Sequence, residues 1–366
     1  MRMLFFLLIL VHGMIHVLGF VKGFGFKEVK GLTMPITKSK GLLWLLAALL
    51  ILVFAWLYGA NAKFAWIVGF VAMGLSQVLV FVYWRDAKFG TLPNVAILLV
   101  SITMAASYWF QARIAQETLQ LTNHHQPLET SYVTEEAIGH LPESVQRWLR
   151  HSGMLGKPFI HIGKVTQRAN MKLKPEQNAW MSAHAVQFTT ADPPSFIWSV
   201  DVRMNSLLGF QGRDKFEDGK GEILIKVNSL LTVVNEAGEK LDEGTLQRYL
   251  GEVVWFPSMA LSPYITWEAL SDSSVRATME YKGTRGSGVF HFSPEGDLVL
   301  FSAMRFRGNE SDAGRREWIL QVEDHKVFEG IRVPSKMTAT WGLETGEWTW
   351  LKLEIVDLTY NQPFTP

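Results

Sequence analysis

The sequence predicts a four-helix transmembrane anchor followed by an α+β, mainly antiparallel β domain with a curved sheet or half-barrel and a crossing helix. The first observation is that the first third of the chain holds four apolar runs without a single Asp, Glu, Lys or Arg. Each run is close to the roughly 20 residues that a helix needs to cross a bilayer. The second observation is that the rest of the chain alternates polar and apolar residues between short turn signals. The four runs are Met3–Val21, Gly41–Ala62, Phe64–Trp84 and Phe89–Ala112.

These patterns divide the chain into three regions. We expect a transmembrane domain over residues 1–112, a linker over 113–134 and an extracytoplasmic β-rich domain over 135–366. The linker contains the adjacent residues His124 and His125. We interpret them as exposed linker residues rather than metal ligands, because no carboxylate or third imidazole stands nearby.

Positively charged residues predict the orientation of the four helices. The loop after the first run holds five lysines against a single glutamate, and the loop after the third holds Arg85 and Lys88. Short loops rich in Lys and Arg stay in the cytoplasm, so both termini are expected outside it, with Arg2 as the one contrary charge. We therefore expect a multi-pass protein of the bacterial inner membrane. The first run starts like a signal peptide but lacks a clear small-residue cleavage site, so we expect it to be retained.

The charge distribution and the absence of cysteine exclude several classes of function. Residues 1–113 carry 10 basic and 2 acidic side chains, a charge of +8, whereas residues 114–366 carry a charge of −7. An acidic soluble domain argues against nucleic acid as a partner, because phosphate binding needs a basic patch. Without cysteine there are no disulfides, no thiolate catalysis and no cysteine-ligated metal.

Two histidines in the first run are the sharpest candidates for a polar site within the membrane. His12 and His16 are four residues apart and so share a helical face. Imidazoles at membrane depth are costly without partners, which would suit haem, metal or quinone contacts or a proton relay. We prefer a helix–helix hydrogen bond, for example to Ser76 and Gln77 in the third run. No other histidine lies in a predicted span to supply a second axial haem ligand, so we expect no cofactor and no metal.

A second polar group is expected at the cytoplasmic edge of the membrane. Asp86 and Lys88 lie there beside Asn94. They could hold a polar headgroup, but interfacial charge pairing is the interpretation that we prefer.

The soluble domain is expected to open with a short helix over residues 142–150 and to continue as strands. Proline and an acid in the first turn of that helix suit its free N–H groups and its dipole. Consecutive short strands with tight turns then predict an antiparallel meander. The expected strands are 159–162, 180–188, 196–202, 221–227, 275–281, 288–292, 298–306, 318–322, 335–341 and 348–360.

One helix interrupts the strands and is expected to lie across the sheet. It is predicted to start at Gly244 and to end at Trp255, because Pro257 cannot continue the hydrogen-bond ladder. Arg248 and Glu252 are four residues apart and so share a face of this helix.

The charged residues on this helix and on a preceding segment form the candidate ligand site. We expect them to meet inside or at the rim of a cavity, where a carboxylate and an arginine could also form an acid/base pair. Structural ion pairing is the default interpretation, and the nine tryptophans of the domain are expected first as core. The candidate ligand-binding residues are Arg213, Asp214, Arg248, Glu252 and Trp255.

A search for catalytic motifs is negative. The sequence has no nucleophile elbow, no H-E-x-x-H, no Walker A loop and no dinucleotide fingerprint after a strand, so we assign no catalytic residue. The segment Gly283–Gly288 is rich in glycine, but it joins two strand patterns and is expected as a hairpin turn rather than a phosphate cradle.

Three stretches of the sequence resemble a bacterial integral membrane protein family of unknown function. They are His12–Phe20 (HGMIHVLGF), Trp84–Asn94 (WRDAKFGTLPN) and Arg248–Pro257 (RYLGEVVWFP), and the similarity extends over nearly the whole chain. The resemblance implies four N-terminal membrane helices and a C-terminal domain, without an established activity. By pattern alone, the strand-rich domain also resembles the LolA, LolB and RseB group of periplasmic carriers and sensors. That resemblance implies a half-barrel around an apolar cavity that accepts acyl chains.

The sequence thus favours a membrane-anchored extracytoplasmic binding module for a lipid, lipopeptide or other apolar ligand in the bacterial envelope. The alternatives are an envelope enzyme acting on lipid-linked substrates, or a ligand-free structural or signalling partner of another membrane protein. An apolar cavity would favour the first, converging ionisable groups the second, and a closed dry core the third. The expected partners are the lipid bilayer, an apolar ligand or a lipoprotein, and a membrane protein of unknown identity.

Overall fold

The computed structural model describes residues 2–123, 131–205 and 208–362, so the histidine pair at 124 and 125 lies outside the described residues. The chain divides into two compact units. One is Met1–Ala112 with Asn228–Leu230, and the other is Arg113–Val227 with Leu231–Pro366. Each unit has its own buried apolar core.

The apolar runs form four candidate membrane spans, each long and apolar enough to cross a bilayer, as the sequence predicts. The first three are α1 (Arg2–Gly23), α2 (Lys38–Gly59) and α3 (Ala65–Val82). The fourth consists of α4 (Trp84–Ala87), the 3₁₀ turn η1 (Lys88–Gly90) and α5 (Thr91–Asn123). Helix α5 continues to Asn123, so the first half of the segment expected as a linker is helical.

Small residues let the helices of the first unit approach one another closely. A Cβ atom at Gly19 would lie 2.3 Å from the ring of Trp44, and one at Gly23 would lie 3.0 Å from the Cα of Gly41. Apolar contacts between helices in lipid are no better than contacts with lipid tails, so close backbone packing is a main source of stability. The α1–α2 contact therefore depends on these glycines.

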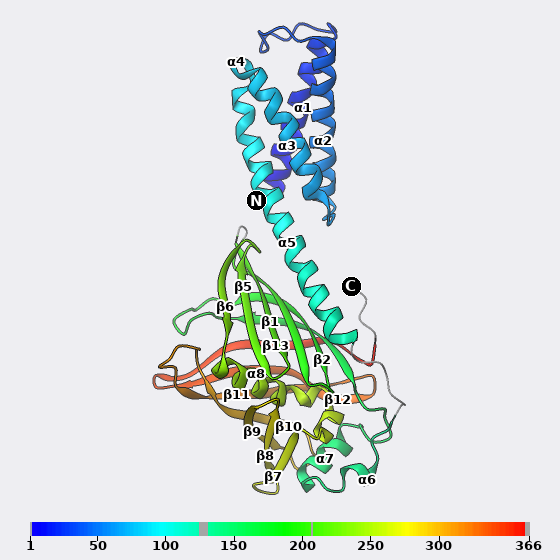
Figure 1. Ribbon diagram of the computed structural model, residues 1–366, viewed down its shortest axis with the longest axis vertical. Helices are drawn as coiled ribbons and strands as arrows, with labels where there is room; N and C mark the ends of the chain where they lie inside the picture. Colours follow the sequence, from blue (N-terminus) through cyan, green and yellow to red (C-terminus); the bar gives the residue numbers. More distant parts are fainter. Residues whose placement is uncertain (1, 124–130, 206–207, 363–366) are drawn as a thin grey trace. The chain divides into compact units, whose positions relative to one another are not determined.

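The second unit is built on a single 13-stranded sheet in which every neighbouring pair is antiparallel. Its order is β6-β5-β4-β3-β2-β1-β13-β12-β11-β10-β9-β8-β7, so the first and last strands of the chain pair in the middle. The sheet curves strongly, because β11 and β12 run across the direction of β5 and β6 (Figure 1). The predicted antiparallel, curved sheet is confirmed. The strands are β1 (Ile162–Met171), β2 (Met181–Thr190), β3 (Ser195–Arg203), β4 (Gly209–Glu217), β5 (Lys220–Val227), β6 (Leu231–Ala237), β7 (Ile265–Ala269), β8 (Ser274–Tyr281), β9 (Thr284–Phe292), β10 (Leu298–Phe306), β11 (Arg315–Phe328), β12 (Ile331–Leu343) and β13 (Gly346–Tyr360).

Three of these strands, β4, β6 and β7, were not predicted from the sequence, and β1 was predicted only at its first residue, Ile162. Strand β4 contains two glycines and four charged side chains, so it lacks the run of β-branched and aromatic residues that marks a strand. Strands β6 and β7 are the edges of the sheet, only seven and five residues long and largely exposed, so each gives a short signal in the sequence. The first predicted strand, 159–162, is instead a loop that leads into β1.

The predicted helix at the start of the second unit is present as α7 (Glu143–His151), preceded by the single turn α6 (Glu135–Ile138). Pro142 is its N-cap, and Glu143 lies in its first turn. The face of α7 that contains Val145, Trp148 and Leu149 is buried. It therefore packs as the amphipathic pattern predicts.

The crossing helix α8 (Glu239–Glu252) starts five residues earlier than the sequence predicts and continues into η2 (Val253–Trp255) and η3 (Pro257–Leu261). Gly238, with φ of 140°, is its N-cap. Gly244 therefore lies inside the helix. A Cβ atom there would lie 3.3 Å from Nη2 of Arg305, so this glycine provides space for an arginine of strand β10 rather than a helix start.

Helix α8 is almost wholly enclosed, and it packs against β4, β5, β8, β9 and β10. Leu246, Leu250 and Val254 are fully buried in the core that the helix shares with the sheet. Burial of a large apolar side chain contributes about 1.5–3 kcal/mol relative to exposure, so this contact is a principal source of stability. The helix and the sheet together enclose the candidate site.

Candidate functional site

An apolar cavity of about 300 Å³ lies between α8 and the sheet of the second unit. Its walls come from α8, η2 and eight strands, namely β1, β3, β4, β5 and β10–β13. Ligand cavities of this kind are typically about 300–1,000 Å³, mainly apolar and furnished with a few polar groups. Its lining residues include Met171, Trp198, Val200, Phe210, Ile223, Ile225, Trp255, Trp318, Leu320, Met337, Trp341, Trp350, Leu351 and Leu353.

Arg248 is the centre of a charged cluster on one wall of this cavity. Its Nη1 donates to Oδ2 of Asp214 at 2.8 Å, and its Nε donates to Oε1 of Glu252 at 2.8 Å. The guanidinium group also lies over the rings of Phe196 and Trp198, 4.8 and 4.9 Å from their centroids. The structure therefore brings together three of the charged residues that the sequence analysis selected.

Gln187 of β2 completes this cluster. It accepts from Nη2 of Arg248 at 2.9 Å and donates from Nε2 to Glu252 at 2.6 Å and to Thr189 at 3.0 Å. Burial raises the pKa of Asp214, although Arg248 and Arg213 act in the opposite direction. Each charged group of the cluster thus has a hydrogen-bonded partner, which is what buried charges require.

The sequence grouped Arg213 with Asp214, but Arg213 does not line the cavity. Successive side chains of a strand point to opposite faces of a sheet, and the two residues are neighbours on β4. Nε of Arg213 lies 3.0 Å from Glu117, at the end of α5, and its Nη1 donates to Glu222 at 2.8 Å. Arg213 is therefore a buried structural ion-pair residue on the other face of the sheet.

Trp255 does line the cavity, as a residue of η2, and it is 2% exposed. Tyr360 donates a hydrogen bond to its carbonyl oxygen at 2.9 Å, which ties η2 to the end of β13. The indole nitrogen of Trp255 has no partner among the described residues. The side chain therefore contributes an apolar wall to the cavity.

Arg305 of β10 is a cavity residue that the sequence analysis missed. Its guanidinium group lies over the rings of Trp318 and Trp341, 4.1 and 5.8 Å from their centroids. Its buried Nε has no hydrogen-bond partner among the described residues. Burial and the nearby Arg248 lower its pKa to about 9, so it remains a cation at neutral pH. The period of two along β10, from the buried residues Phe301 and Ala303, was the signal that could have placed it inside.

The lining of the apolar cavity contains few nucleophilic groups. Among the described lining residues there is no serine, histidine, lysine or tyrosine. The one hydroxyl group, that of Thr245, donates to the carbonyl oxygen of Leu241 within α8. The wall therefore presents apolar groups, Gln167, a paired charged cluster and one further arginine. It also presents the indole N–H groups of Trp255, Trp318 and Trp350, which have no partner among the described residues.

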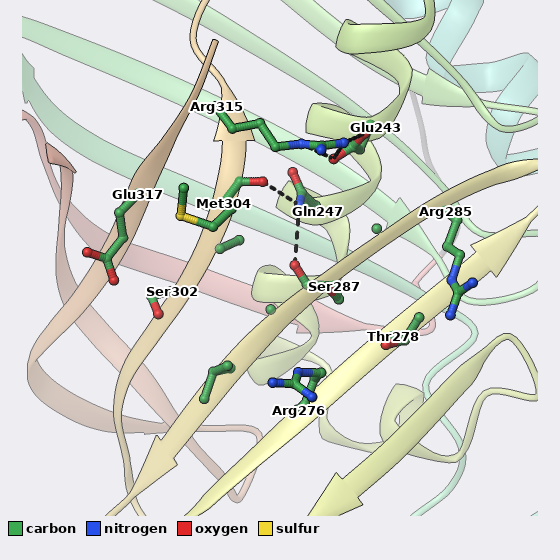
Figure 2. Close-up of a pocket in the computed structure, with 14 residues that line it drawn as sticks. Glu243, Gln247, Arg276, Thr278, Arg285, Ser287, Ser302, Met304, Arg315 and Glu317 are labelled. Carbon is green, nitrogen blue, oxygen red and sulfur yellow. Dashed lines mark hydrogen bonds and ion pairs between the residues drawn. The ribbon is translucent and has the colours of Figure 1, made fainter. Parts of the chain in front are cut away.

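A second, more polar hollow of about 590 Å³ lies over β8–β11, at the place where β9 and β10 separate. Figure 2 shows Gln247 of α8 between the two strands, where it donates to the carbonyl oxygens of Ser287 at 3.3 Å and Met304 at 3.1 Å. Arg315 at the rim is paired with Glu243 at 2.7 Å. Gln247 thus forms the floor of this hollow, and its amide donors are already used by the two strands. We therefore take the apolar cavity, and not this hollow, as the candidate ligand site.

The glycine-rich segment beside this hollow belongs mainly to strand β9, not to a turn. The hairpin turn consists of Lys282 and Gly283, both with positive φ, and β9 begins at Thr284. A Cβ atom at Gly286 would lie 2.7 Å from Cγ of Gln247, so this glycine is required for close approach of α8. The hairpin interpretation is correct in kind, but the turn is shorter than predicted.

In the first unit, His12 and His16 belong to a buried hydrogen-bond network. Nε2 of His12 lies 2.9 Å from Oδ1 of Asn94, and Oγ of Ser76 lies 2.8 Å from Nε2 of His16. Asn94 also donates to Gln77 at 2.9 Å. The hydrogen bond to Ser76 is the one that the sequence analysis preferred, whereas Gln77 acts through Asn94.

The partners of this network assign its protons. Nδ1 of His16 lies 2.9 Å from the carbonyl oxygen of His12, so it must be a donor. In a neutral imidazole the other nitrogen is then an acceptor. The single proton of Ser76 can go either to this nitrogen or to Oδ1 of Asn94, which lies 2.9 Å from Oγ. No group of three or more His, Asp or Glu side chains within residues 2–123, 131–205 and 208–362 could hold a metal ion.

Asp86 fastens the loop between α1 and α2 rather than standing free at the edge of the helices. It accepts from the hydroxyl of Thr33 at 2.7 Å and from the backbone N–H of Met34 at 2.8 Å. Lys88 contacts the ring of Phe89, and Asn94 is buried beside the histidines instead of lying with Asp86. Asp86 also forms an ion pair with Arg85, whose Nε lies 4.0 Å from Oδ1, so charge pairing is present at this edge with Arg85 rather than Lys88 as the partner.

Fold and site define a class of protein with four candidate membrane spans and an antiparallel β unit that contains an apolar cavity. The chain belongs to the family of unknown function DUF6544, whose profile matches residues 131–353. A structure of a LolA superfamily protein from Nitrosomonas europaea is similar at 8% identity, with a TM-score of 0.30. The match covers 61% of this chain and 94% of that one. No curated protein sequence matches this chain.

Proposed function

We propose that this protein is a membrane-anchored binding module for a lipid, lipopeptide or other apolar ligand of the bacterial envelope. The observation that carries the proposal is the cavity of about 300 Å³ between α8 and the sheet, with its wall of aromatic and aliphatic side chains. A cavity of this size inside a well-packed protein loses dispersion contacts unless something fills it. An apolar occupant restores those contacts, and water does not bind well in an apolar space.

Anchoring suits this function, because an apolar ligand that enters from a bilayer avoids a long passage through water. The lysine-rich loop between α1 and α2 supports an orientation with the second unit outside the cytoplasm, in the inner membrane of a bacterium. Alkaline phosphatase, which is active only outside the cytoplasm, should be active when fused after Tyr360 and inactive when fused at Thr33. The reverse pattern would place the cavity in the cytoplasm.

Native mass spectrometry of the full-length protein, released from maltoside micelles and then extracted with organic solvent, tests the binding proposal. We expect a bound apolar species in the wild type. Ala339→Leu adds bulk inside the cavity and should reduce the bound fraction several-fold. Ala237→Leu, on the exposed edge strand β6, is the control and should leave the bound fraction unchanged. A folded wild-type protein without any bound species, even after incubation with lipid extract, would refute the proposal.

A further inference from the structure

Three arginines of the second unit are buried or half-buried, and one of them lacks an acceptor. Arg213 is paired with Glu117 and Glu222, and Arg248 is paired with Asp214 and Glu252. For Arg305 the described residues offer neither an ion pair nor a hydrogen-bond acceptor, and its Nε is fully enclosed. Arg305 is partly exposed as a residue, but its enclosed Nε is an exception to the rule that buried polar groups are paired.

The two tryptophans that stack on Arg305 do not supply what it lacks. The guanidinium carbon lies over the rings of Trp318 and Trp341, which attract its positive charge. The faces of these rings offer no oxygen acceptor, so they do not replace a hydrogen-bond partner for the five N–H donors of the guanidinium group. A planar group with free donors suits recognition of a carboxylate or phosphate.

The surroundings of Arg305 provide room for such an anion. Arg305 lines the same cavity as the apolar side chains Leu320 and Met337. On the helix side it faces Gly244, where any side chain would approach Nη2 to about 3.3 Å. The carboxylates Asp214 and Glu252 on the same wall are both held by Arg248, so neither needs Arg305 as its partner.

We propose that Arg305 receives the anionic head of the ligand, a carboxylate or a phosphate, while the apolar lining holds its hydrocarbon chain. This inference rests on the proposed binding function and narrows it: the ligand class is an anionic amphiphile rather than any apolar molecule. Binding is a hydrogen-bonded ion pair of Arg305 with the head oxygens, and no covalent step is involved. An ion pair of this kind favours ligands with an anionic head over ligands with a neutral head, because a neutral head would leave donors of Arg305 without acceptors.

A pair of photoreactive probes tests the inference on the full-length protein in phosphatidylcholine nanodiscs. One probe is dodecanoic acid with a diazirine in its chain, and the other is the matching dodecanol. After irradiation at pH 8, labelling of peptides from residues 113–366 is measured relative to labelling of the membrane helices. The acid should label the cavity peptides of the wild type about tenfold more than the alcohol, the factor expected for one charge-assisted hydrogen bond.

Variants connect the preference to the guanidinium group. Arg305→Gln should lower labelling by the acid to the level of the alcohol, and Arg305→Lys, which keeps the charge, should keep part of the preference. Arg307→Gln is the control, because Arg307 is an exposed arginine two residues away that also stacks on a tryptophan, Trp348. Arg307→Gln should leave labelling by the acid and labelling by the alcohol unchanged. Thermal unfolding of each variant confirms that the domain is folded.

The outcomes separate this inference from the proposed function. Equal labelling of the cavity by acid and alcohol in the wild type would refute the proposal that the ligand has an anionic head, and the proposed binding function would still stand. Absence of cavity labelling by either probe would refute the binding module itself. Loss of acid labelling, but not of alcohol labelling, in excess inorganic phosphate would support an anion site in the cavity. A preference for the acid that survives Arg305→Gln would assign the anion to another residue.

Discussion

Glu252 provides the sharpest test of whether the charged cluster at the cavity contributes to stability. The substitution Glu252→Ala removes two hydrogen bonds, one from Nε of Arg248 at 2.8 Å and one from Nε2 of Gln187 at 2.6 Å. The side chain of Glu252 is 9% exposed and that of Arg248 is 15% exposed, so solvent screens the pair only weakly. Removing one partner of a buried ion pair typically costs about 3–5 kcal/mol.

The expected loss for Glu252→Ala lies at the lower end, about 3 kcal/mol, because Arg248 keeps Asp214 as a partner. Glu268→Ala is the matched control. Glu268 pairs with Arg276 at 3.0 Å, but their side chains are 63% and 47% exposed, and such a pair contributes only about 0.2–1 kcal/mol. Arg248→Ala should cost more than Glu252→Ala, because it leaves both Asp214 and Glu252 without their cation.

Urea-dependent pulse proteolysis of the full-length protein in maltoside measures these differences in the second unit. With a urea dependence of about 2 kcal/mol per M, a loss of about 3 kcal/mol lowers the midpoint by roughly 1.5 M. The double variant Arg248→Ala/Glu252→Ala should not recover stability, since Asp214 then remains buried and unpaired. A midpoint for Glu252→Ala that equals that of Glu268→Ala would show that the cluster is merely solvated, and the reasoning would fail.

Three further outcomes are expected. Trp255→Ala should lower the free energy of unfolding by about 3–5 kcal/mol in the same assay, because it leaves a void in the cavity wall. Burial lowers the pKa of His325, so the folded state holds its proton less tightly than the unfolded chain and loses stability as the pH falls below about 6.5. His325→Gln should therefore reduce the stability lost between about pH 7 and 5, a change that the exposed His291→Gln should not produce. In the membrane helices, Ser76→Ala should cost about 1 kcal/mol in an SDS titration, whereas Ser101→Ala, whose buried hydroxyl has no partner among the described residues, should be nearly neutral.

The membrane helices were predictable because their signal is one of composition. A run of about 20 residues without charge is read directly from the sequence, whatever it packs against. The antiparallel meander was predictable for a similar reason, since period-two alternation and tight turns are local. Strand β4 was not, because its pattern is interrupted by Gly209, Gly212 and a run of charged residues that neighbouring strands accommodate.

The candidate site was predictable only in part. Arg248 and Glu252 were found because their spacing on a helix places them on one face. Asp214 was grouped with them correctly, but Arg213 was added wrongly. Because β4 was not predicted as a strand, neighbouring residues 213 and 214 were not expected to point to opposite faces of the sheet. Arg305 was missed altogether, since an arginine near the end of a strand usually reaches solvent.

The sequence by itself determined the existence of two regions, the four apolar helices, the antiparallel class of the β domain and one charged face of α8. Each of these depends on neighbours within a few residues, through hydropathy, periodicity or helical spacing. Only the tertiary structure decided that an apolar cavity remains between α8 and the sheet, that Arg248 serves two carboxylates, and that Arg305 lies among tryptophans without an acceptor. Those facts depend on how β3–β5 and β10–β13, far apart in the chain, curve around one helix, and no local pattern records that curvature.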